Sequence, residues 1–193
     1  KAGIKSIDDI VSLDEISEMD VQQSEAKFSI PDLDESKLEK LPIHRSIAAT
    51  LSYIGDALFF ANQIKTSLKY YWKSLEILKK LSIDKDGTPS EEIAASYNNI
   101  GATLNRLGFS AAAICYFEEA LDIYHAIYGK NSNVIHEDIA STLSNLAGAV
   151  GSIGGRTDDV IQYLLKALVV QIKLHGDGKR HGVHPTIATT YNK

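Results

Sequence analysis

The chain has 193 residues, of which 44% are hydrophobic and 23% charged, and its formal net charge is −5 at pH 7. This composition is ordinary for a globular protein, and it lacks the basic footprint that nucleic-acid binding requires. No stretch approaches the roughly 18 apolar residues of a membrane span, so the sequence predicts neither a nucleic-acid partner nor membrane insertion. The single cysteine, Cys115, cannot form an internal disulfide, which favours a reducing, cytoplasmic location.

The first 43 residues form an acidic segment that differs from the rest of the chain. Residues 1–40 carry eleven acidic and five basic residues, a net charge of −6. Within the segment, the apolar cluster Phe28–Ile30 is followed by Pro31 and several acidic residues. Three interpretations stay open: a helix that caps the following domain, a solvated linker, or a pseudo-ligand that folds into the domain's own binding groove. The chain begins at Lys1 rather than Met, as a fragment of a longer protein would.

An internal repeat occupies the remainder, 44–193. Three segments of similar sequence, 47–55, 93–101 and 139–147, begin with isoleucines that are 46 residues apart. A fourth begins 48 residues further on, at Ile187, and stops with the chain. Self-similarity at a fixed period is typical of repeat architectures, in which each copy is one supersecondary unit.

The second copy shows what that unit is. Apolar residues from Ile93 to Leu107 recur at steps of three and four, which predicts an amphipathic helix that ends at Gly108. A second apolar stripe runs from Ala113 to Tyr128 and ends at Gly129. The pattern therefore predicts that each copy consists of a helix, a short turn and a second helix. We predict an all-α, antiparallel helix-hairpin solenoid with three complete hairpins, at about 44–86, 90–130 and 136–176, and a partial one at 184–193.

Small residues lie midway along the first helix of each copy, at Gly55, Gly101 and Ala147. Glycine inside a helix costs about 1 kcal/mol relative to alanine. We therefore expect another helix to approach closely at these positions, so that the two antiparallel helices of a hairpin meet there.

The repeat resembles the tetratricopeptide family. The first copy departs from the pattern at two positions, with Asn62 in place of the turn glycine and Ser74 in place of a later alanine. The long period and the openings at His136 and His184 resemble kinesin light chain-type repeats. This resemblance implies a right-handed superhelix that binds a protein or peptide ligand on its concave face. The residues that carry it are Tyr97, Ile100, Gly101, Leu104, Gly108, Ala113, Phe117 and Ala120.

In this family the first helices of successive hairpins line the concave face, which makes their non-core residues candidate contacts. Asparagine can bond a peptide backbone through both its donors and its acceptor, and arginine can hold a carboxylate with two hydrogen bonds. Gly148 and Gly151 would permit close approach by a ligand. The candidate groove residues are Ser52, Asp56, Phe59, Asn98, Asn105, Arg106, Ser144, Asn145 and Asn192.

Structural roles compete with these assignments. Asn98 and Asn105 fit a groove or a packing role equally well, and Asn145 can instead bond between adjacent helices. Phe60 is favoured as a core residue, and Cys115 as a small buried hydrophobe. His175, His181 and His184 do not have the spacing of a zinc site, and the glycine-rich segment 151–157 lacks the lysine of a phosphate loop. We therefore expect no metal, no cofactor and no enzymatic activity.

The leading functional prediction is a non-catalytic scaffold or adaptor that binds a peptide or protein segment in the concave groove. Two alternatives stay open. One is a regulatory sensor module of a larger signalling protein, gated by its own acidic segment. The other is an oligomerisation block that associates through an open face at the C-terminal end, because terminal repeats normally need a polar cap.

Overall fold

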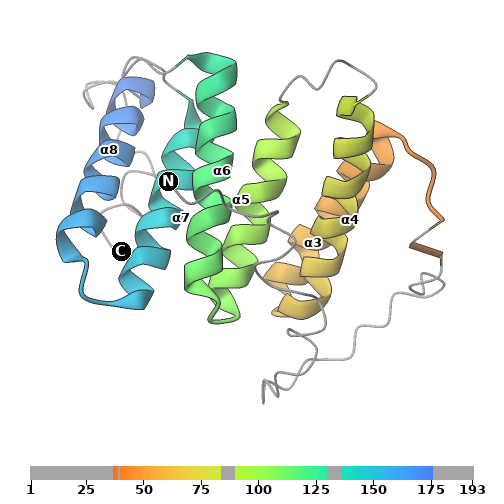
Figure 1. The fold of residues 1–193 in the computed structure, drawn as a ribbon, viewed down its shortest axis with the longest axis horizontal. Helices are drawn as coiled ribbons and strands as arrows, with labels where there is room; N and C mark the ends of the chain where they lie inside the picture. The colour runs from red at the N-terminus through yellow and green to blue at the C-terminus, as the bar shows by residue number, and fades with distance from the viewer. Residues whose placement is uncertain (1–36, 39, 84–89, 130–135, 176–193) are drawn as a thin grey trace. The chain divides into compact units, whose positions relative to one another are not determined.

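The computed structural model describes residues 37–38, 40–83, 90–129 and 136–175 (Figure 1). They belong to two compact units, Lys1–Thr88 and Pro89–Lys193. The apolar cluster and most of the acidic segment lie outside the described residues. So do the partial fourth hairpin with Asn192, and both His181 and His184.

The first unit contains one helical hairpin, formed by α3 (Arg45–Phe60) and α4 (Ile64–Ile83). Helix α3 begins after His44, whose ring nitrogen accepts a hydrogen bond from the backbone N–H of Ser46. Asn62 lies in the turn with a φ of 63°, a left-handed conformation that asparagine adopts more readily than most residues. Asparagine can therefore replace the turn glycine that the repeat pattern expects here.

The second unit contains two hairpins: α5 (Glu91–Arg106) with α6 (Ser110–Tyr128), and α7 (Glu137–Ile153) with α8 (Thr157–His175). Helix α6 also packs against α7, so the two hairpins stack. All regular structure in the described ranges is helical. The predicted all-α helical-hairpin solenoid is confirmed, and the handedness of its superhelix stays a prediction.

At Gly55 and Gly101 the predicted close approach of the second helix is made by an aromatic ring. A Cβ added to Gly55 would lie 2.6 Å from a ring carbon of Tyr71, and one added to Gly101 would lie 2.8 Å from a ring carbon of Phe117. Both distances are far below normal carbon contact, about 3.5–4.0 Å. Each glycine thus lets a large ring from the second helix of its hairpin lie directly on the first.

Ser74 replaces the alanine of the repeat pattern without leaving a polar group unsatisfied. Its buried hydroxyl donates a 2.7 Å hydrogen bond to the carbonyl of Ala48 on α3. A buried hydroxyl is tolerated when it is bonded in this way. The first hairpin therefore gains a polar tie between its two helices at a point where the second has only packing.

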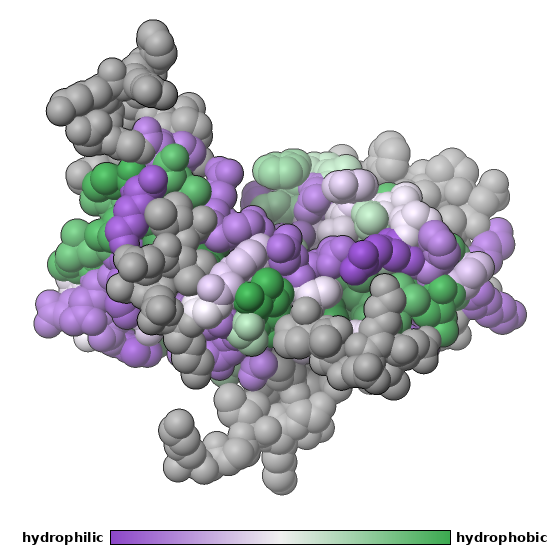
Figure 2. Space-filling view, turned by 90° about the horizontal axis from the view of Figure 1, so that it is seen from above, coloured by the Kyte–Doolittle hydropathy of each residue, from purple (hydrophilic) through white to green (hydrophobic). Residues whose placement is uncertain are grey.

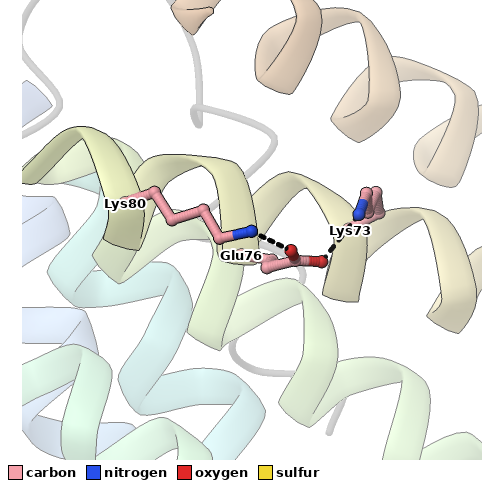
Figure 3. Close-up of polar contacts among 3 residues, drawn as sticks. All are labelled: Lys73, Glu76 and Lys80. Atoms are coloured by element: carbon pink, nitrogen blue, oxygen red, sulfur yellow. Dashed lines mark hydrogen bonds and ion pairs between the residues drawn. The ribbon is translucent and has the colours of Figure 1, made fainter. Parts of the chain in front are cut away.

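The solvent side of α4 carries a small network of charges (Figure 3). Glu76 pairs with Lys73 at 2.8 Å and with Lys80 at 2.6 Å. Partial burial alone would raise the pKa of the Glu76 carboxyl, but hydrogen bonds to the two lysines and their charges lower it below its ordinary value. The pair of Glu76 and Lys80 is well exposed and contributes only a few tenths of a kcal/mol, whereas the Lys73 side chain is 14% exposed and lies against the helix surface.

Candidate peptide-binding surface

Two predicted groove residues meet in the second unit. Asn145 on α7 donates a 3.1 Å hydrogen bond from its side-chain amide to the side-chain carbonyl of Asn98 on α5, and both residues are half-buried. The open alternative for Asn145, a bond between adjacent helices, is therefore observed. This bond uses one donor and one acceptor of the pair. In the described part of the chain, no other side-chain bond engages the remaining Asn98 N–H groups or the Asn145 carbonyl oxygen.

Ser144, next to Asn145, is more than nine-tenths buried. Its hydroxyl has no hydrogen-bond partner among the described residues. Thr103 and Thr142 behave differently, because each donates to the backbone carbonyl four residues earlier in its helix. A buried hydroxyl without a partner costs roughly 1–3 kcal/mol, so this residue is a poor choice for stability alone.

The other two candidates on α5 lie at its C-terminal end. The side-chain carbonyl of Asn105 accepts a 2.7 Å hydrogen bond from the hydroxyl of Ser110, which ties the end of α5 to the first residue of α6. Asn105 thus has a structural role in the turn. Arg106 is the last residue of α5 and is exposed. Its role in binding a carboxylate stays a prediction.

The three candidates in the first unit, Ser52, Asp56 and Phe59, are all half-buried on α3. The phenol of Tyr71 donates a 2.7 Å hydrogen bond to Asp56. Burial, followed by this bond and the carboxylate charge, raises the pKa of the Tyr71 phenol. One oxygen of Asp56 is therefore engaged within its own hairpin.

Phe60 was expected in the core, and this expectation is wrong. The residue is 83% exposed and touches Phe59 edge-on, with ring centroids 6.0 Å apart. Phe60 continues the exposed face of α3, three residues after Ala57 and seven after Tyr53, on the side opposite the buried residues of the helix. Its position two residues after the buried Leu58 turns its side chain away from α4.

A pocket of about 340 Å³ lies between α7 and α8. Sequence reasoning singled out Gly148 and Gly151 as places of close approach, but it did not find the wall that α8 supplies. The sequence does contain a signal for this wall. When α8 is aligned with α6 at a spacing of 47 residues, Leu164 takes the position that Phe117 has in the preceding hairpin. The pocket is lined by Ala147, Gly148, Gly151, Ser152, Val160 and Leu164.

The outer side of α8 carries an apolar stripe, which we define as Ile161, Leu165, Val169 and Ile172. These side chains are 43–54% exposed and follow one another at steps of four, four and three residues. Apolar surface is visible over the α7–α8 end in Figure 2. The matching positions of α6 are Ile114, Glu118, Asp122 and His125, so three of the four are polar there.

Cys115 was expected to be buried and is half-buried. Its thiol contacts the carbonyl of Ala111 at 3.6 Å. Burial and the nearby charges of Glu118 and Glu119 raise the pKa of the thiol, which lowers its thiolate fraction at neutral pH.

Among the described residues, no group of three or more His, Cys, Asp or Glu side chains is placed to hold a metal ion. None of the described helices is long and apolar enough to cross a membrane.

Comparison with known proteins agrees with this architecture. Residues 92–173, less than half of the chain, match the family model described as tetratricopeptide repeat. The chain is also similar to the crystal structure of BtubC (BKLC) from P. vanneervenii, with a TM-score of 0.58 and 18% sequence identity. The alignment covers 81% of this chain and 61% of that one, so the chain spans less than two thirds of that protein's length. At this identity the likeness shows the fold alone. No curated protein matches the sequence.

Proposed function

We propose that the chain is a non-catalytic scaffold that binds an extended peptide segment across α5 and α7 of its second unit. Tetratricopeptide repeats generally mediate protein–protein interaction, and the matched residues 92–173 include α7 and nearly all of α5. The observation that carries the proposal is the amide pair of Asn98 and Asn145, half-buried on first helices of adjacent hairpins.

The chemistry of the pair suits a peptide backbone. A peptide group offers one donor and one acceptor, and the pair retains both kinds of group after making its internal bond. The internal bond also fixes the two side chains relative to each other, which lowers the entropy lost on binding. Backbone recognition of this kind tolerates many sequences, so additional contacts must supply specificity.

Selection from a random peptide library displayed on phage, with the whole chain as bait, tests the proposal. Peptides enriched on the wild type should bind Asn98→Ala and Asn145→Ala roughly five- to thirtyfold more weakly, because truncating a half-buried amide contact costs roughly 1–2 kcal/mol. Gln162→Ala, on the exposed face of α8, is the matched amide control. Equal binding by all four proteins would contradict the proposed site.

Gating by the acidic N-terminal segment is a regulated form of the same function. A synthetic peptide of residues 20–41 should then compete with the selected peptides for the whole chain, and the Asn98→Ala variant should bind both more weakly. A lack of competition would leave the segment as a cap or linker. The cytoplasmic location and the kinesin light chain-like subclass also belong to this proposal, and both rest on sequence alone.

Self-association is a second candidate function, and the apolar stripe of α8 favours it. Four exposed apolar side chains on one helix face form a surface that oligomers commonly bury. In light scattering coupled to size exclusion, Leu165→Glu should lower the mass of any oligomer to that of a monomer. Gln162→Glu, which places a new charge on an already polar residue of α8, should leave it unchanged. A wild type that is monomeric at high concentration would remove this candidate.

A further inference from the structure

The pocket between α7 and α8 has a structural origin in the repeat itself. In the first two hairpins, the second helix places an aromatic ring on the small residue of the first helix, Tyr71 on Gly55 and Phe117 on Gly101. In the third hairpin the corresponding residues are Leu164 and Ala147, and both line the pocket. The third hairpin therefore lacks the ring that the other two supply from their own chain.

The neighbouring glycines keep the space open. A Cβ added to Gly148 would meet no atom within 4 Å, and one added to Gly151 would meet only Val160, at an ordinary contact distance of 3.7 Å. Neither glycine has a positive φ, so no backbone conformation requires glycine at these two positions. Gly151 and Ser152 are exposed, which makes the pocket accessible from the surface.

The lining defines the kind of occupant. The only side-chain polar group in it, the Ser152 hydroxyl, already donates a 2.9 Å hydrogen bond to the carbonyl of Gly148. The rest of the lining side chains are hydrocarbon, and backbone at the two glycines adds polar surface, which together fit an apolar side chain attached to a peptide backbone. A volume of about 340 Å³ is at the lower end of the range for small-molecule sites, roughly 300–1,000 Å³. It suits one side chain rather than a cofactor.

A second observation places polar side chains next to this pocket. The unpartnered hydroxyl of Ser144 belongs to the residue one helical turn before Gly148, so the two positions are neighbours on α7. Asn145, with its remaining amide groups, lies in the same turn. A side chain seated in the pocket would bring its own backbone toward the half-buried Asn145, whereas the Ser144 hydroxyl lies beneath the surface.

We propose that the pocket receives an aromatic side chain of a peptide partner, of the size of phenylalanine. The ring would take the place that Tyr71 and Phe117 occupy in their own hairpins and would anchor the peptide. This inference rests on the proposed peptide binding and adds the residue class that gives it specificity.

The test uses ¹⁵N-labelled whole chain and three capped amino acids. N-acetyl-phenylalaninamide should shift the backbone amide signals of Gly148 and Gly151 in a saturable way, with a Kd on the order of 1 mM. N-acetyl-alaninamide should cause no saturable shift, and N-acetyl-leucinamide should bind at least about threefold more weakly. Equal binding of the leucine and phenylalanine compounds would overturn the aromatic assignment, and no shift with any of them would overturn the pocket.

Two substitutions at Gly148 distinguish a loss of binding caused by a filled pocket from one caused by unfolding. Gly148→Leu fills the pocket and should abolish the shift at Gly151, whereas Gly148→Ala adds one methyl group and should weaken binding by less than about threefold. Both replace a helical glycine in open space, so both should raise the melting temperature by roughly 2–4 °C. Loss of binding in a more stable protein can only come from the filled pocket.

Library-selected peptides then distinguish this inference from the proposed function. Peptides that lose affinity at least about tenfold in Gly148→Leu, and that contain an aromatic residue, would support both. Peptides that depend on Asn98 and Asn145 but bind Gly148→Leu normally would leave the proposed function standing and refute the pocket.

Discussion

The contact between Gly101 and Phe117 allows a sharp test of how these hairpins are held together. Gly101→Ala places a Cβ 2.8 Å from the ring, at least about 0.7 Å closer than normal carbon contact. Phe117 is fully buried, so its ring cannot move aside without disturbing the core. Overpacking of this kind costs roughly 1–3 kcal/mol, and the better helix propensity of alanine returns about 1 kcal/mol. We expect a net loss of roughly 0–2 kcal/mol in the free energy of unfolding, instead of the gain that alanine gives at an open helical position.

The compensating change is already present in the third hairpin, where Ala147 faces Leu164. Phe117→Leu alone should destabilise by roughly 1–2 kcal/mol, because it leaves space above Gly101. The double variant Gly101→Ala/Phe117→Leu recreates the pairing of the third hairpin. It should therefore be more stable than the sum of the single effects predicts, with a coupling of about 1 kcal/mol or more.

Urea unfolding of the four proteins, followed by circular dichroism at 222 nm, measures this coupling. Gly148→Ala is the matched control, because its new Cβ meets no atom within 4 Å and should stabilise the protein by about 1 kcal/mol. If Gly101→Ala stabilised the protein as much as Gly148→Ala, or if the double variant were simply additive, the ring would not be what makes glycine necessary.

Three further predictions concern single side chains. Ser144→Ala should raise the free energy of unfolding by roughly 1–3 kcal/mol, because it removes a buried hydroxyl without a partner. A loss of stability would show that a bond exists. Cys115 should react with iodoacetamide at pH 7.5 more slowly than a free thiol because its pKa is raised. Glu118→Gln removes a negative charge that raises this pKa, so it should speed the reaction, and an unchanged rate would exclude the charge effect. Asn62→Gly should be neutral or slightly stabilising in thermal melts, whereas Asn62→Ala should cost roughly 1 kcal/mol because of the positive φ.

Features set by residues close in sequence could be predicted from the sequence. The hairpins follow from steps of three and four between apolar residues, and their turns follow from glycine or asparagine at one position. Asn62 fits this rule because its left-handed φ can be inferred from the residue type and its place in the repeat. The exposure of Phe60 also agrees with the helical period, because Phe60 continues the exposed face of Tyr53 and Ala57, and only its apolar character pointed to the core.

The candidate site could be predicted only in part, since it depends on pairing between helices. Sequence reasoning placed Asn98 and Asn145 in neighbouring hairpins, but their bond joins residues 47 positions apart and depends on how α5 packs near α7. Asn105 looked equivalent to Asn98, and yet its carbonyl is engaged by Ser110 in the local turn. Identical residue types on one helix thus differ in availability for reasons that the helical period does not contain.

The three hairpins together suggest what the repeat preserves at the crossing of its two helices. Gly55 with Tyr71 and Gly101 with Phe117 combine the smallest residue with a large ring, and the ring fills the space that the missing side chain leaves. Ala147 with Leu164 adds a methyl group on one helix and gives up a ring on the other. If side-chain volume at the crossing alone decided the packing, the pair of Ala147 and Leu164 would fill the third hairpin as well as the glycine–ring pairs fill the first two. It does not, because Gly148 and Gly151 remove side-chain volume beside the crossing and leave a pocket. Since both substitutions to alanine are sterically permitted and would improve helix propensity, folding alone gives no reason to keep glycine there. A binding role for the open space supplies one.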